Sequence, residues 1–183
     1  MGKRPINREK YIQRLKQLLW AEHSWKSARD LCELALSLPE LKSWNHLEHA
    51  MATGVVVSYA RPFGKNDGIG SLKKDFRTFD DKLMKQNHDL LLKARDTIFG
   101  HKDHAWELDQ LEIEPTYTIK IAEDSTFKTF SQGLVVNHFD GILQLLKYQL
   151  ERMKKSKERH IQLIADTGIP AGDYTLGEDF PPY

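Results

Sequence analysis

Residues 87–104, NHDLLLKARDTIFGHKDH, combine a helical pattern with a group of histidine, arginine and aspartate side chains. The apolar residues here and just before recur at the spacing of a helix with one apolar face: Leu83, Leu90, Leu91, Ala94 and Ile98. We therefore predict a helix from about Phe79 to Phe99. Gly100 is suited to end it, because glycine readily adopts the left-handed conformation that follows many helices.

The same periodicity predicts helices over most of the remaining chain. Residues 1–38 carry two apolar stripes, with a break expected near residues 21–24, where Ser24 would cap a second helix. Further helices are predicted over residues 40–59 and 137–166. Gly168 is expected to end the last of these in a left-handed conformation.

Residues 105–136 show a different pattern. PTYTIKIA (115–122) alternates apolar and polar side chains, which predicts a strand, and TFKTF (126–130) would be its hairpin partner or part of a helix. The predicted fold is mainly α, an up-and-down helical bundle with a small β-hairpin-like insertion at about 111–131. We expect a single domain over 1–168 and an irregular acidic tail over 169–183.

The composition is that of a globular protein. The 183 residues are 40% hydrophobic and 29% charged with a net charge of +1, so no global basic field indicates nucleic acid. Basic runs near residues 1–16 and 151–160 predict solvated faces or, alternatively, an RNA-binding surface. The single Cys32 is expected in the core, and no membrane span or secretory signal is evident, which predicts a cytoplasmic location.

Two interpretations of residues 87–104 follow from the residues alone. In the first, the basic side chains complement the negative C-terminal end of a helix dipole. In the second, pairs of histidines three residues apart, His46 with His49 and His101 with His104, close a metal site. HLEH is not the HExxH motif, and one cysteine excludes a multi-thiolate zinc site, so we predict neither metal nor cofactor.

A third interpretation is a resemblance. SYARPFGKNDGIG (58–70) followed by HDLLLKARDTIFGHKD (88–103) resembles uncharacterised bacterial proteins of the HEPN superfamily. These are helical bundles marked by an arginine, a polar residue and a histidine near the end of a bundle helix. The matching residues here are Arg95, Asp96 and His101, and the resemblance covers roughly residues 40–105.

The resemblance implies a metal-independent endoribonuclease that acts as a homodimer, with two Arg/His pairs in one cleft. Arg95 would hold the phosphate through two parallel hydrogen bonds, and His101 would move protons, since imidazole titrates near neutrality. Asp96 would orient Arg95 or its dimer mate. His88 and His104 would extend the binding site.

Arg61 and Lys65, in the loop before the predicted third helix, would extend an anion site. RNA is the implied ligand, and an antitoxin-like protein of a toxin or defence system is an implied partner. The alternative is a non-enzymatic interaction or dimerisation module in which the Arg/His motif is structural.

Overall fold

A computed structural model describes residues 8–38, 45–64, 69–72, 74–96, 118–121, 127–130 and 139–168 of the chain. Most of these residues lie in four α-helices: α1 (Arg8–Ser37), α2 (Asn45–Ala60), α3 (Lys82–Ala94) and α4 (Phe139–Ala165). Two short 3-10 helices, η2 (Arg61–Phe63) and η3 (Lys74–Arg77), lie between α2 and α3. The prediction of a mainly helical bundle is confirmed.

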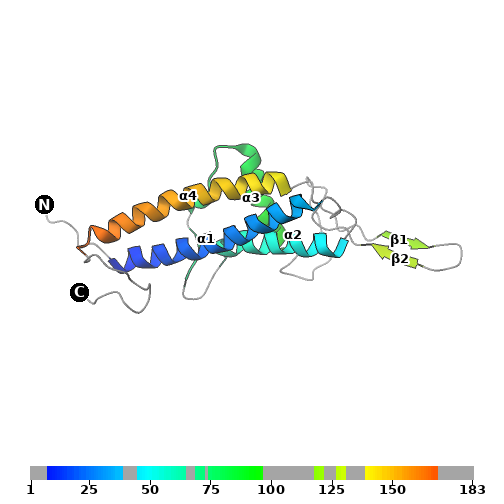
Figure 1. Ribbon diagram of the computed structural model, residues 1–183, viewed down its shortest axis with the longest axis horizontal. Coiled ribbons are helices and arrows are strands. Elements are labelled where there is room, and N and C mark those ends of the chain that lie inside the picture. Colours follow the sequence, from blue (N-terminus) through cyan, green and yellow to red (C-terminus); the bar gives the residue numbers. More distant parts are fainter. Residues whose placement is uncertain are drawn as a thin grey trace.

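The longest helices, α1 and α4, run side by side in opposite directions (Figure 1). Two ion pairs between α1 and α4 show that the helices are antiparallel. Lys157 near the end of α4 pairs with Glu22, and Lys147 near its start lies 3.7 Å from Glu33, farther along α1. The shorter helices α2 and α3 pack against the half of this pair where α1 ends and α4 begins (Figure 1).

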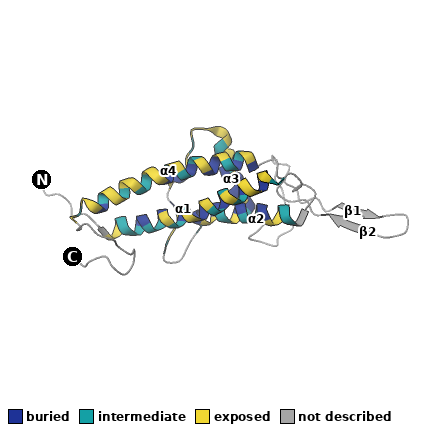
Figure 2. Cartoon of the chain, in the orientation of Figure 1, coloured by how far each residue is buried: buried dark blue, intermediate teal, exposed yellow. Residues whose placement is uncertain are grey.

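The core lies where the buried faces of the four helices meet (Figure 2). Its centre is aromatic. The Trp25 indole stacks on the Tyr59 ring at 6.0 Å and donates a hydrogen bond to the Tyr59 carbonyl at 3.0 Å. Phe63 and Phe76 pack against the same indole. Because these rings come from α1, α2, η2 and η3, they fix both 3-10 helices to the bundle.

Two predicted helix starts differ from the structure. The predicted break near residues 21–24 is wrong, because α1 is continuous and Ala21 and Ser24 are both buried in it. Neither glycine nor proline interrupts this stretch, so nothing local stops the helix. Helix α3 begins at Lys82 rather than near Phe79, because the Asp81 carboxylate caps it by accepting the Met84 N–H at 2.7 Å.

Helix α4 ends as its sequence predicts. Gly168 has a φ of +79°, and its N–H donates to the Ala165 carbonyl at 3.0 Å, so the left-handed conformation expected there is confirmed. The predicted tail, 169–183, lies outside the described residues, as does Gly100. In the described part of the chain, no helix is both long and apolar enough to cross a bilayer.

A two-stranded antiparallel pair lies beyond the ends of the helices in Figure 1. It consists of β1 (Thr118–Ile121) and β2 (Phe127–Phe130), with Thr118 opposite Phe130 and Ile121 opposite Phe127. Both strands fall inside the interval in which the sequence predicts the insertion.

Candidate functional site

Arg95 lies where α3 ends. The inner face of the helix is buried through Leu90, Leu91 and Ala94. The Arg95 backbone N–H donates to the carbonyls of Leu91 and Leu92, and the backbone then widens into a π turn at Arg95 and Asp96. The Arg95 side chain is 29% exposed, so it lies at the rim of the bundle and can be reached from solvent.

The Arg95 guanidinium is held between a carboxylate and a glycine. Its Nε donates to Oδ1 of Asp96 at 2.6 Å, and its Nη2 contacts the same oxygen. On the other side, a Cβ added to Gly64 would lie only 3.2 Å from Nη1. The absence of a side chain at Gly64 therefore leaves room for the guanidinium beside the η2 turn.

Asp96 orients Arg95 without burying it. The Asp96 side chain is 61% exposed, and an ion pair between exposed side chains contributes little to stability. A phosphate, which can accept two parallel hydrogen bonds from a guanidinium, would compete effectively with this single carboxylate oxygen. The ion pair with Asp96 thus orients the Arg95 guanidinium, and a phosphate can still replace the Asp96 carboxylate as its partner.

His88 does not share the solvent-facing position of Arg95. Its side chain is 1% exposed, its Nδ1 lies 2.7 Å from the Tyr59 hydroxyl, and its ring packs against Phe63 and Phe79 at 4.9 and 5.0 Å. Burial lowers the pKa of His88 to about 4, so the ring is neutral near pH 7. His88 is therefore a core residue, and the binding role that we expected for it has no geometric support.

Arg61 lies near Arg95 through its backbone, since its carbonyl oxygen and Arg95 Nη1 are 3.5 and 3.2 Å from the Cβ position of Gly64. It begins η2, its guanidinium lies over the Trp20 ring at 5.2 Å, and its carbonyl accepts the Gly64 N–H at 3.2 Å. Pro62 suits the first turn of a 3-10 helix because its fixed φ is helical and its missing N–H is not needed there. The structure thus brings Arg61 and Arg95 to the same short turn, Arg61–Gly64.

Several predicted site residues cannot be placed. Lys65, His101 and His104 lie outside the described residues. The same holds for the side chain of His46, a member of the predicted pair His46 and His49. Over the ranges that the structure describes, no group of three or more potential metal ligands is found.

Arg77 was not predicted as a site residue from the sequence. Its Nη2 donates to the Phe63 carbonyl at 2.9 Å, and its guanidinium lies over the Phe63 ring at 5.2 Å. The only local signal is the basic and aromatic composition of KKDFR (73–77), which has no helical or strand period. Its contact with Phe63 depends on the way η2 and η3 pack against the core.

The comparisons with known proteins add no relative. No protein-family model, no curated protein and no solved structure matches this chain significantly.

Proposed function

We propose that this chain is a HEPN-like protein that binds RNA and cleaves it without a metal ion. The observation that carries the proposal is the placement of Arg95. Its guanidinium is accessible, oriented by Asp96 and seated beside Gly64 at the end of a packed helix. A guanidinium held in this way matches the charge and geometry of a phosphodiester.

The proposed reaction is an internal transfer. The ribose 2′-oxygen attacks the adjacent phosphorus, the bond from phosphorus to the 5′-oxygen breaks, and a 2′,3′-cyclic phosphate remains. The 2′-hydroxyl proton passes to one His101, and the 5′-oxygen receives a proton from a second His101, supplied by the partner in a homodimer. Arg95 would stabilise the additional negative charge on the phosphate oxygens in the transition state.

The resemblance extends the proposal to the protein's surroundings. It implies a cytoplasmic protein and an antitoxin-like partner that would restrain the nuclease. In this proposal, Arg61 and Lys65 extend the anion site near Gly64. His104 is a further binding residue in this proposal.

A second candidate is a non-enzymatic interaction module. It is favoured by one observation: Arg95 stands at the C-terminal end of α3, where a cation stabilises the helix dipole, and it is already paired with Asp96. In that case Arg95 and His101 would contribute to helix stability and to packing against a partner.

Cleavage assays on Arg95→Lys and His101→Ala distinguish these candidates. A nuclease should act in EDTA, and loss of His101 should lower the rate by about 10²–10⁴-fold. Arg95→Lys should restore little activity, because an ammonium cannot form the two parallel bonds of a guanidinium. Both variants should unfold at the wild-type temperature.

Arg29 provides a matched control. Its Nε and Nη2 donate to Oδ1 of the adjacent Asp30 at 3.0 and 2.7 Å, the same pairing that joins Arg95 to Asp96. Arg29→Lys should leave cleavage unchanged. A dimer that leaves RNA intact, with His101→Ala changing only the melting temperature, would establish the interaction module instead.

A further inference from the structure

The turn Arg61–Gly64 is contacted by two arginines from different elements. Arg77, the last residue of η3, donates to the carbonyl of Phe63. Arg95, at the end of α3, faces the adjacent Gly64. Neighbouring Cα atoms are about 3.8 Å apart, so the two side chains lie beside consecutive residues of one backbone turn, and Arg77 is hydrogen-bonded to it.

Arg77 is held in a fixed orientation. One of its five N–H donors binds the Phe63 carbonyl, and the flat guanidinium rests over the Phe63 ring. The side chain is nevertheless exposed. Because its position is set before any ligand arrives, Arg77 would lose little conformational entropy when it binds an anion.

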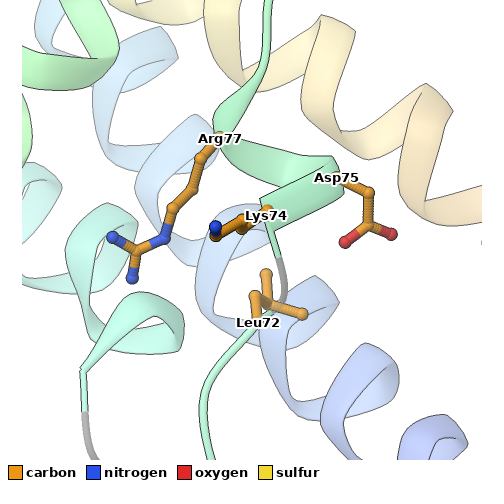
Figure 3. A pocket seen from close by; sticks show the side chains of 4 residues that line it. All are labelled: Leu72, Lys74, Asp75 and Arg77. Atoms are coloured by element: carbon orange, nitrogen blue, oxygen red, sulfur yellow. The ribbon is translucent and has the colours of Figure 1, made fainter.

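Arg77 lines an open hollow of about 680 Å³ together with Leu72, Lys74 and Asp75 (Figure 3). Figure 3 shows the Lys74 and Arg77 side chains extending to one side of η3 and the Asp75 carboxylate extending to the other. Asp75 is paired with Arg14, whose guanidinium lies 3.3 Å from it and is 6% exposed. The Asp75 charge is therefore offset by a buried cation, and the side of the hollow with Lys74 and Arg77 is electropositive.

We propose that this hollow binds a backbone phosphate of an RNA strand, near the phosphate held by Arg95. The inference rests on the proposed function and extends it, because it names a single strand with at least two phosphates as the ligand. A strand with one phosphate at Arg95 and another beside η3 would cross the turn Arg61–Gly64. Cleavage position would then be set by backbone contacts that carry no base sequence.

Binding of a 5′-fluorescein-labelled 2′-O-methyl oligouridylate, followed by fluorescence anisotropy at several salt concentrations, tests this inference. The probe lacks the attacking hydroxyl, so binding is measured without cleavage. Lys74→Gln and Arg77→Gln should each weaken binding and flatten the slope of log K against log salt. The double variant should flatten the slope by about 0.7 in total, the value for one phosphate contact on a single strand, because both side chains hold the same phosphate.

Lys147→Gln is the control for charge alone, since this exposed lysine of α4 pairs with Glu33 away from η3. Lys74 is exposed, so Lys74→Gln should keep the wild-type melting temperature and remain informative even if Arg77→Gln unfolds. Two results would overturn the inference. In the first, Lys147→Gln flattens the slope of log K against log salt as much as Lys74→Gln does. In the second, Lys74→Gln leaves that slope unchanged.

Competition by inorganic phosphate and by adenosine monophosphate separates a strand from a small anion. Displacement of the probe by either compound at concentrations comparable to that of the oligonucleotide would identify a small-phosphate site and overturn the inference. Unchanged slopes in a chain that still cleaves RNA through Arg95 would reject the hollow and leave the proposed function intact. Flattened slopes in a chain that cleaves nothing would support the hollow and reject the nuclease.

Discussion

The Tyr59 hydroxyl lies 2.7 Å from His88 Nδ1. The hydrogen bonds of the neighbouring Gln149 side chain indicate which of these two groups is the donor. Gln149 Oε1 accepts from Arg152 at 3.2 Å, and its Nε2 donates to the Phe76 carbonyl at 2.9 Å, so the amide orientation is determined. The same Nε2 lies 3.5 Å from the Tyr59 oxygen. Donation from Gln149 to the Tyr59 oxygen favours the arrangement in which Tyr59 donates its own proton to His88 Nδ1 and the His88 proton lies on Nε2.

Tyr59→Phe should destabilise the protein by about 1–3 kcal/mol, because it leaves a buried histidine acceptor without its donor. Urea denaturation at pH 7 measures the change in the free energy of unfolding. Tyr148→Phe is the matched control, since Tyr148 is only partly buried and its ring contacts with Phe79 and Arg152 survive the change. Equal effects of the two variants would contradict a special role for the Tyr59 hydroxyl.

Stability should fall as the pH is lowered from about 6.5 to about 4, in part because of His88. Burial lowers its pKa from 6.5 to about 4 in the folded protein, so the unfolded chain binds the proton more readily within this window. The stability due to neutral His88 is fully present above pH 6.5 and is lost as the pH approaches 4. Below about pH 4, His88 is protonated in both the folded and the unfolded chain, so it causes no further loss of stability.

His88→Gln removes this titration and keeps an acceptor for Tyr59. The free energy of unfolding of this variant should therefore depend less on pH than that of the wild type between pH 4 and 6.5. His23→Gln, at an exposed histidine of α1, is the matched control for the replacement of a histidine by glutamine. Parallel profiles for wild type and His88→Gln would show that another group causes the acid loss.

The helical architecture could be predicted because apolar residues recur at helical spacing over most of the chain, and Gly168 marks the end of α4. The core position of Cys32 was also predictable from its apolar surroundings. It is buried, and burial raises its pKa to about 12. The start of α3 after Asp81 could not be predicted from the spacing of apolar residues. The cap is a single side-chain hydrogen bond, whereas the pattern of apolar residues continues past it.

The candidate site was less predictable because its contacts join distant parts of the chain. His88 lies on the same edge of its helix as Leu91, and that apolar edge was the available sign that it packs inward. Its partner Tyr59 is 29 residues away, and Arg77 is 14 residues from Phe63. Neither separation is a helical or strand period, so only the packed core shows these pairs.

Gly64→Ala should impair Arg95 without unfolding the chain. The Gly64 φ of −78° suits alanine, but the added Cβ would lie 3.2 Å from Arg95 Nη1 and displace the guanidinium. The guanidinium must shift by a few tenths of an ångström to accept this Cβ. Misplacement by about 1 Å can cost up to ~10²-fold in rate, so this smaller shift should lower RNA cleavage by less than that while the melting temperature is kept. In an Arg95→Gln background, Gly64→Ala should cause no further loss. Additive losses would show that Gly64 acts on another group.

The last prediction concerns the homodimer that the proposed mechanism requires. Because His88 points into the core, an interface on α3 would use its outer stripe, whose exposed residues are Leu83, Gln86, Asp89, Lys93 and Asp96. A two-fold interface brings the same surface patch of both protomers together. Asp89 of one protomer can then pair with the partner's Lys93, and Lys93 with the partner's Asp89. Leu83, 59% exposed, would supply apolar area at the same contact.

Light scattering at micromolar concentration should therefore report a dimer that Leu83→Asp converts to a monomer. Leu34 on α1 and Ile161 on α4 are matched controls, since they are 49% and 54% exposed and lie on other helices. Leu34→Asp and Ile161→Asp should remain dimeric. If either of these dissociates the dimer and Leu83→Asp does not, the interface lies away from α3. A wild-type monomer would reject the shared cleft, because a single chain supplies only one His101 for the two proton transfers.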